Sequence, residues 1–143
     1  MIYHAMLQAS DFVLGFWGSN PENMGEPTWN ESFTFANATN AFLIGSPDFS
    51  STFKTTILID EPRCIEHPDF HKLLDVDERG LLISDIVELD GNNQIELKRA
   101  NVGHYLPIPW TGNTDVQIYV LDWVNDADGN PAPHQIELRL SSL

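Results

Sequence analysis

The sequence is short of cysteine, of long apolar runs and of a leader-like start. Cys64 is the only cysteine among 143 residues, so no internal disulfide can form and a reducing compartment is expected. No stretch reaches the roughly 20 apolar residues that cross a bilayer. The first five residues contain neither a basic region nor a small-residue cleavage site, so no secretory signal is predicted. These absences predict a soluble, cytoplasmic protein.

Basic residues are scarce as well. Seven Lys and Arg stand against 21 Asp and Glu, which gives a formal net charge of −14, and no Lys or Arg precedes Lys54. Nucleic-acid affinity depends on cations that displace counterions from phosphates, so direct binding of DNA or RNA is not expected. An anionic membrane surface is disfavoured for the same reason. The charge favours either a basic protein partner, which it would attract over a distance, or solubility alone.

Sequence motifs for catalysis are also missing. The chain has no Gly-x-Ser-x-Gly elbow and no glycine-rich phosphate loop. Two carboxylate pairs, Asp75 with Asp77 and Asp126 with Asp128, have the residue type for acid–base work. Both pairs fall in turn-like stretches, where solvated surface charge is the ordinary explanation. We therefore expect no enzyme, no catalytic residue and no cofactor.

The residues that are present predict one β domain. Hydrophobic residues make up 42% of the chain, enough for a core, and residues 1–143 are expected to form a single domain. Short β-rich segments separated by turn formers predict a mostly β protein, an antiparallel β-sandwich of about eight strands with at most one or two short helices. The expected strands are residues 2–8, 11–17, 41–44, 53–60, 81–89, 94–98, 116–124 and 134–140.

Two of these strands have informative patterns. In residues 53–60, the residues Phe53, Thr55, Ile57 and Ile59 alternate with more polar ones and should share one face of a strand. Residues 116–124 are apolar on both faces, which predicts a central strand with Trp123 in the core. A proline-interrupted piece, residues 105–110, is expected at a sheet edge, because proline cannot donate to a ladder.

Residues 66–78 are the best helix candidate. Pro68 suits a first helical position, and Phe70, Leu73 and Leu74 would share one face. A turn and a loop are the alternative. On a helix, His67 and His71 would have a plausible metal-ligand spacing, but no third ligand follows at motif spacing, so no metal site is predicted.

The stretch from Asp126 to Asn130 has two interpretations. Asp126, Asp128 and Asn130 occupy the first, third and fifth positions of a calcium loop. Pro131 then falls where that loop requires glycine, and strands rather than helices flank it. A hairpin turn built on Asp-Gly and Asn-Pro chemistry explains the same residues, and it is the interpretation we favour.

Three stretches of the sequence resemble a known family. They are residues 28–31 after a long loop, residues 74–84 entering a strand, and residues 97–123 with an extended approach to the central strand. Their order and hydrophobic pattern are similar to the competence protein J family, small acidic proteins that inhibit a DNA-entry nuclease. The resemblance covers about residues 28–124. It implies an immunity or inhibitor protein that neutralises a nuclease or nuclease toxin.

The expected contact residues combine acidic loops with tryptophans that border loops. Such aromatics anchor interfaces, although Trp29 and Trp110 could equally cap the sandwich. The predicted partner-binding residues are Glu22, Glu26, Trp29, Asp75, Asp77, Glu78, Trp110, Asp122, Asp126 and Asp128. A monomer or weak dimer is expected. The alternatives are a calcium- or lipid-responsive module of the C2 type, and a small enzyme or carbohydrate-binding β domain.

Overall fold

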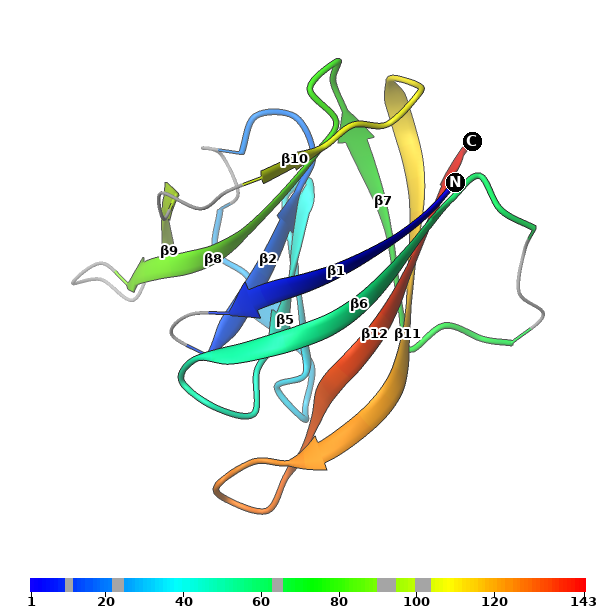
Figure 1. Cartoon of the computed structure of the whole chain (residues 1–143). Coiled ribbons are helices and arrows are strands. Elements are labelled where there is room, and N and C mark those ends of the chain that lie inside the picture. The colour runs from blue at the N-terminus through cyan, green and yellow to red at the C-terminus, as the bar shows by residue number, and fades with distance from the viewer. Residues whose placement is uncertain (10–11, 22–24, 63–65, 90–94, 100–103) are drawn as a thin grey trace.

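The chain folds into two β-sheets packed face to face (Figure 1). The computed structural model describes residues 1–9, 12–21, 25–62, 66–89, 95–99 and 104–143, and gives only the backbone of residues 84–89 and 95–99. These residues form twelve strands and no helix. None of them therefore forms a helix long and apolar enough to cross a membrane. The predicted sandwich is confirmed.

The first sheet has five strands. In spatial order they are β1 (Ile2–Ala9), β6 (Ser51–Ile59), β12 (Pro131–Ser142), β11 (Gly112–Asn125) and β7 (Phe70–Val76). Neighbours run antiparallel except β6 and β12, which pair in parallel. A parallel pair cannot be joined by a tight turn. Here the pair joins segments about 80 residues apart in the chain, so the sandwich contains one parallel pair in addition to its antiparallel pairs.

The second sheet has seven strands. Its path runs β10 (His104–Leu106), β8 (Leu81–Leu89), β2 (Val13–Trp17), β5 (Ala41–Gly45), β4 (Phe35–Ala38) and β3 (Thr28–Trp29), with β9 (Ile95–Arg99) pairing with β8 off this path. Strands β8 and β9 correspond to the expected strands at residues 81–89 and 94–98 and pair antiparallel, while the residues that connect them lie outside the described residues. The short strand β10 ends the path and stops before Pro107, as the proline-interrupted sequence predicted.

Alternating side chains of both sheets form the core. Phe53, Thr55, Ile57 and Ile59 of β6 are all buried, which confirms the predicted facing. Aromatic rings join the sheets: Phe35 of β4 stacks on Phe70 of β7 with ring centroids 5.1 Å apart. Inward-facing residues of β12 are equally buried, so the last strand is part of the core.

A second apolar cluster lies around Trp17 on the other face of the second sheet. Trp17, Ala36, Ala41, Leu43 and Leu82 are buried there. The indole of Trp17 lies over Gly15, where an added Cβ would come within 2.3 Å of the ring. Glycine is needed at this position because no other residue leaves room for the indole.

The helix expected at residues 66–78 does not form. Residues 70–76 are strand β7, in which Phe70 and Leu74 face the core while Leu73 is exposed. Asp69 does not cap a helix, since its carboxylate accepts a hydrogen bond from the backbone N–H of Val120 at 2.7 Å. The segment gains more by pairing with β11 than by forming a short isolated helix, and tertiary pairing overrides the local signals.

Strand β11 is interior, between β12 and β7, as predicted. Its second half departs from the prediction. The register with β12 shifts between Val120 and Asp122 and again before Trp123, as at a β-bulge. At these shifts, the side chains of Leu121, Asp122 and Trp123 are exposed. The placement of Trp123 in the core was therefore wrong, because the bulge and the projecting hairpin direct this side chain to solvent.

Candidate functional site: an aromatic hollow beside the β11–β12 turn

The predicted contact residues divide between two opposite ends of the sandwich. Strand β11 runs from Gly112, opposite Val76, to Asn125 at the hairpin turn, a length of roughly 40 Å. The β7–β8 turn lies at the first end and the β11–β12 turn at the second (Figure 1). Asp75, Asp77 and Glu78 therefore lie at the first end, and Asp126 and Asp128 lie at the second. One compact partner surface cannot be built from all of them.

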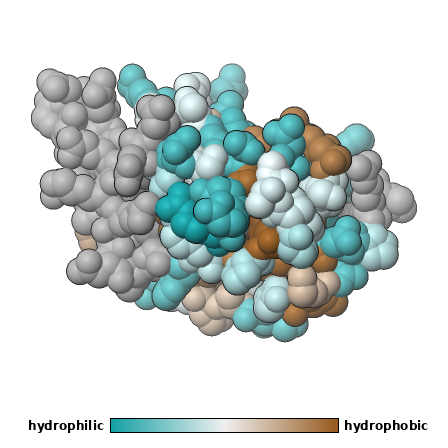
Figure 2. All heavy atoms as spheres, turned by 90° about the horizontal axis from the view of Figure 1, so that it is seen from above, coloured by the Kyte–Doolittle hydropathy of each residue, from teal (hydrophilic) through white to brown (hydrophobic). Residues whose placement is uncertain are grey.

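At the first end, an arginine neutralises part of the negative charge. Arg79 donates to Asp77 at 2.7 Å and stacks over the ring of Tyr105 at 5.2 Å. The hydrogen bonds from Arg79 lower the pKa of Asp77, so this carboxylate is already paired. Glu78 is exposed. Figure 2 looks down on this end and shows a mostly hydrophilic surface with smaller hydrophobic areas.

Asp75 and Trp110 have structural contacts at this same end. The backbone N–H and C=O of Asp75 are both bound by the side chain of Asn40, and Trp110 is half-buried against the core. The indole N–H of Trp110 donates to Thr114 at 2.9 Å. Of the two interpretations left open for Trp110, the cap of the sandwich fits these contacts.

The second end contains a hollow of about 320 Å³. Four connections meet there: the β1–β2 turn, the β3–β4 turn, the start of the β5–β6 connection and the β11–β12 turn. We call it the aromatic hollow, and its lining residues are Phe12, Val13, Trp29, Ser32, Phe33, Thr34, Gly45, Ser46, Asp126, Asp128, Asn130, Pro131 and Ala132. It brings together three of the predicted contact residues, Trp29, Asp126 and Asp128. No Lys or Arg is among the lining residues.

Phe12 is held at the hollow in an unusual backbone conformation. Its φ of 66° lies in the left-handed region, which a bulky side chain rarely adopts. Two backbone hydrogen bonds fix it: its N–H donates to Phe49 at 3.1 Å, and its C=O accepts from Ser46 at 2.8 Å. The ring is half exposed and meets Phe49 edge to face, with centroids 5.6 Å apart.

Phe33 has the same conformation on the β3–β4 turn. Its φ is 56°, and 71% of its surface is exposed. Asn30 organises this turn, since its side-chain oxygen accepts from the N–H groups of Thr34 and Phe35. Gly45 allows the turn to come close, because a Cβ there would lie 2.5 Å from the carbonyl oxygen of Phe33.

The β11–β12 turn is built on Asp126. Its Oδ1 accepts from the backbone N–H groups of Asp128 and Asn130, both at 2.9 Å, and Gly129 has a φ of 81°. The hairpin-turn interpretation is thus confirmed. Asp128 is exposed, and its carboxylate has no hydrogen-bond donor among the described residues.

Two of the remaining predicted contact residues lie apart from the hollow. Asp122 is exposed on the hairpin above the turn, and Glu26 is exposed in the connection before β3. Neither lines the hollow. Glu22 and Cys64 lie outside the described residues.

No metal centre is formed by the residues that the structure describes. No three His, Cys, Asp or Glu side chains converge among them. His71 pairs with the buried carboxylate of Asp115, and β7 removes the helical spacing of His67 and His71.

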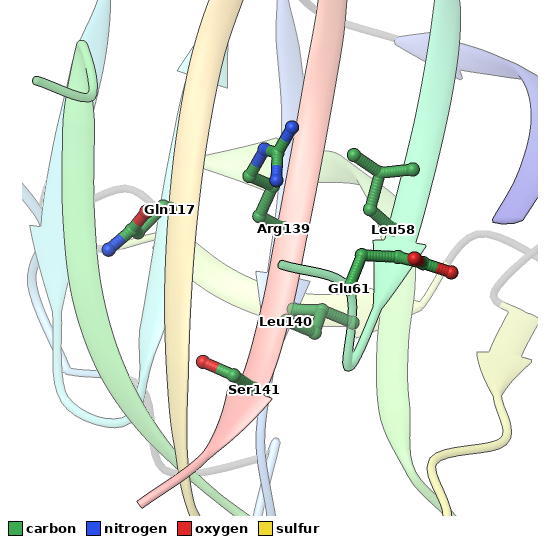
Figure 3. A pocket seen from close by; sticks show the side chains of 6 residues that line it. All are labelled: Leu58, Glu61, Gln117, Arg139, Leu140 and Ser141. Carbon is green, nitrogen blue, oxygen red and sulfur yellow. The ribbon is translucent and has the colours of Figure 1, made fainter. Parts of the chain in front are cut away.

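A second hollow lies on the outer face of the first sheet (Figure 3). It holds about 20 Å³, which is room for one water molecule. Arg139 beside it donates to Glu137 and to the carbonyl of Pro62. The bond to Pro62 holds the start of the β6–β7 connection against the sheet.

The exposed phenylalanines were missed from the sequence. Phe12, Phe33 and Phe49 each follow an Asp or Ser within a turn-forming stretch, which was the only available signal. Aromatic residues normally indicate strands or core. The exposure of these rings, and the left-handed φ angles of Phe12 and Phe33, depend on contacts between turns that are far apart in the sequence.

No protein-family model matches the sequence, and no curated protein matches it. Two solved structures share its fold. The crystal structure of ComJ from Bacillus subtilis, inhibitor of the DNA degrading activity of NucA, aligns over 100% of this chain and 99% of that chain, with a TM-score of 0.58 and 12% identity. A protein described as crocagin biosynthetic gene J aligns over 99% of this chain and 96% of that chain, with a TM-score of 0.50 and 15% identity. The chain therefore has the fold of ComJ along its whole length, which confirms the resemblance found in the sequence over about residues 28–124 and extends it.

Proposed function

We propose that this chain is a cytoplasmic inhibitor that binds and neutralises a basic protein, in particular a nuclease. The aromatic hollow is the observation that carries the proposal, because it combines exposed rings with carboxylates and has no lining Lys or Arg. Rigid aromatics in a pocket are typical of interface hot spots. An exposed apolar site of this kind on an acidic protein suits a partner of opposite charge.

The charge supports a nuclease as the partner. A nuclease presents a basic groove to DNA phosphates, and a net charge of −14 would attract that groove over a distance. Carboxylates at the hairpin end would then take positions that phosphates occupy on the substrate. The shared fold with ComJ, itself an inhibitor of a DNA-degrading activity, agrees with this role.

Binding accounts for the carboxylates better than catalysis does. The pair that lies at the hollow is Asp126 with Asp128, and Asp126 is engaged by the backbone of its own turn. Asp77 of the other pair is bound by Arg79. A general acid or base needs a side chain that is available to a reacting proton, which neither of these two groups offers.

The test is inhibition of purified nucleases encoded in the same genome, with plasmid cleavage as the readout. We expect stoichiometric inhibition of at least one nuclease and co-elution with it in size-exclusion chromatography. The control is magnesium in excess over the protein at constant ionic strength, so that weak binding of magnesium to the acidic surface does not itself lower nuclease activity. Inhibition that magnesium abolishes, or binding to none of these nucleases, would overturn the proposal.

A further inference from the structure

The aromatic hollow has the dimensions of a site for one side chain. Its volume of about 320 Å³ is at the lower end of the roughly 300–1,000 Å³ of ligand pockets. Its walls come from four separate connections, and the strands behind them belong to both sheets. A site mounted in this way on paired strands is pre-organised before any partner arrives.

The two phenylalanines occupy positions where glycine would cost less. A non-glycine residue in the left-handed region is strained, and the strain at Phe12 and Phe33 is maintained by the hydrogen bonds of the surrounding turns. Neither ring is buried, so core packing does not repay this cost. Exposed aromatic rings held at strained positions indicate a binding role rather than a structural one.

The negative charge at the hollow determines which kind of partner side chain can bind there. Asp126 uses Oδ1 within its turn, whereas the exposed carboxylate of Asp128 remains available beside the rings. Aromatic faces next to a carboxylate favour a cation. A planar guanidinium stacks on rings and pairs with a carboxylate at once, which an ammonium does less well.

From this arrangement, and resting on the proposed function, we infer that the aromatic hollow receives an arginine side chain of the basic partner. The guanidinium packs against the rings of Phe12 and Phe33 and pairs with Asp128. The hollow is then the specificity-determining centre of the interface, and the remaining acidic surface assists encounter.

The direct test uses N-acetylarginine amide as the probe and amide chemical shifts of the ¹⁵N-labelled protein as the readout. We expect saturable shifts confined to the four connections around the hollow. N-acetylcitrulline amide, which has the same shape without the charge, should produce none. Equal shifts with citrulline or with N-acetylleucine amide would overturn the inference, since the hollow would then be a neutral or purely apolar site.

Matched variants separate an effect on binding at the hollow from an effect on the stability of the fold. Phe33→Gly should bind the probe and the inhibited nuclease about 30-fold more weakly, as for a hot-spot residue, while its thermal stability stays equal or rises. Phe33→Tyr keeps the ring and should retain binding. Asp128→Asn should weaken binding, whereas Asp60→Asn, the same charge change at an exposed residue outside the hollow, should not.

The outcomes of the two proposals are distinguishable. If a nuclease is inhibited equally by the wild-type chain, Phe33→Gly and Asp128→Asn, the inference about the hollow is wrong and the proposed function stands. If the arginine probe binds in the hollow but no nuclease is inhibited, the proposed function is wrong and the cation site stands.

Discussion

Two tyrosines in this chain have opposite hydrogen-bonding surroundings. The hydroxyl of Tyr119 lies 3.0 Å from the carbonyl oxygen of Glu66 and 3.1 Å from Oε1 of Gln117. The hydroxyl of Tyr105 is buried and has no partner among the described residues. A buried polar group without a partner costs free energy, whereas a bonded one contributes about 1 kcal/mol.

The same substitution should therefore have opposite effects at the two sites. Tyr119→Phe is expected to lower the free energy of unfolding by about 1 kcal/mol, because it removes the bond to the β6–β7 connection. Tyr105→Phe should leave stability unchanged or raise it. Urea unfolding of both variants measures the difference, and equal destabilisation would show that the Tyr105 hydroxyl does have a partner.

Among the elements, the β11–β12 hairpin has the most direct link between local chemistry and the site. Its tip borders the aromatic hollow, and its geometry depends on one carboxylate oxygen, Oδ1 of Asp126, which accepts two backbone hydrogen bonds. The bulge in β11 lies just before the tip and directs Trp123 outward. The position of Asp128 at the hollow therefore depends on this turn.

Substitutions at Asp126 should separate the contribution of its hydrogen bonds to the turn from the contribution of its charge. Asp126→Ala removes both acceptor contacts and is expected to cost about 1–2 kcal/mol of stability and to weaken partner binding. Asp126→Asn keeps an oxygen in place and should remain close to wild type in stability. The urea midpoints of the two variants provide the measurement. If both lost stability equally, charge rather than hydrogen bonding would hold the turn.

For the whole molecule, the dominant property is the imbalance of charge. Between Met1 and Phe53 the only formal positive charge is the N-terminal amine, which contacts Glu61 at 2.8 Å. Arg79 and Arg139 are each bound to a neighbouring carboxylate. The field around the protein is therefore negative, and it acts on the rate of encounter more than on the lifetime of a complex.

Association with the inhibited nuclease should consequently be sensitive to salt. Raising the ionic strength from low to physiological values and beyond should lower the association rate constant at least about tenfold, with a much smaller change in the dissociation rate. Stopped-flow fluorescence with the nuclease measures both. Phe33→Gly should instead dissociate faster from the nuclease. Its association rate constant should keep the same dependence on salt as that of the wild type. A salt-independent association rate would contradict steering by charge.

The class of fold could be predicted from the residues alone. Period-two alternation at Phe53 to Ile59, and the apolar run at Val116 to Val120, specified strands and their buried faces, because a strand side chain has only two directions. The turn at Asp126 was readable for a similar reason, since Asp, Gly and Asn impose their geometry on adjacent residues. The charge of the molecule was likewise fixed by composition.

The location of the site, in contrast, depends on long-range contacts that the sequence does not reveal. Residues 70–76 form a strand because β11 offers them partners, and no local signal reports a partner strand about 40 residues away. The division of the predicted acids between two ends, and the pairing of Asp77 with Arg79, also depend on topology. Phe12 and Phe33 became candidates for binding because turns distant in sequence hold them, strained and exposed, beside one hollow. Local residue chemistry specifies elements, whereas long-range pairing specifies which elements meet.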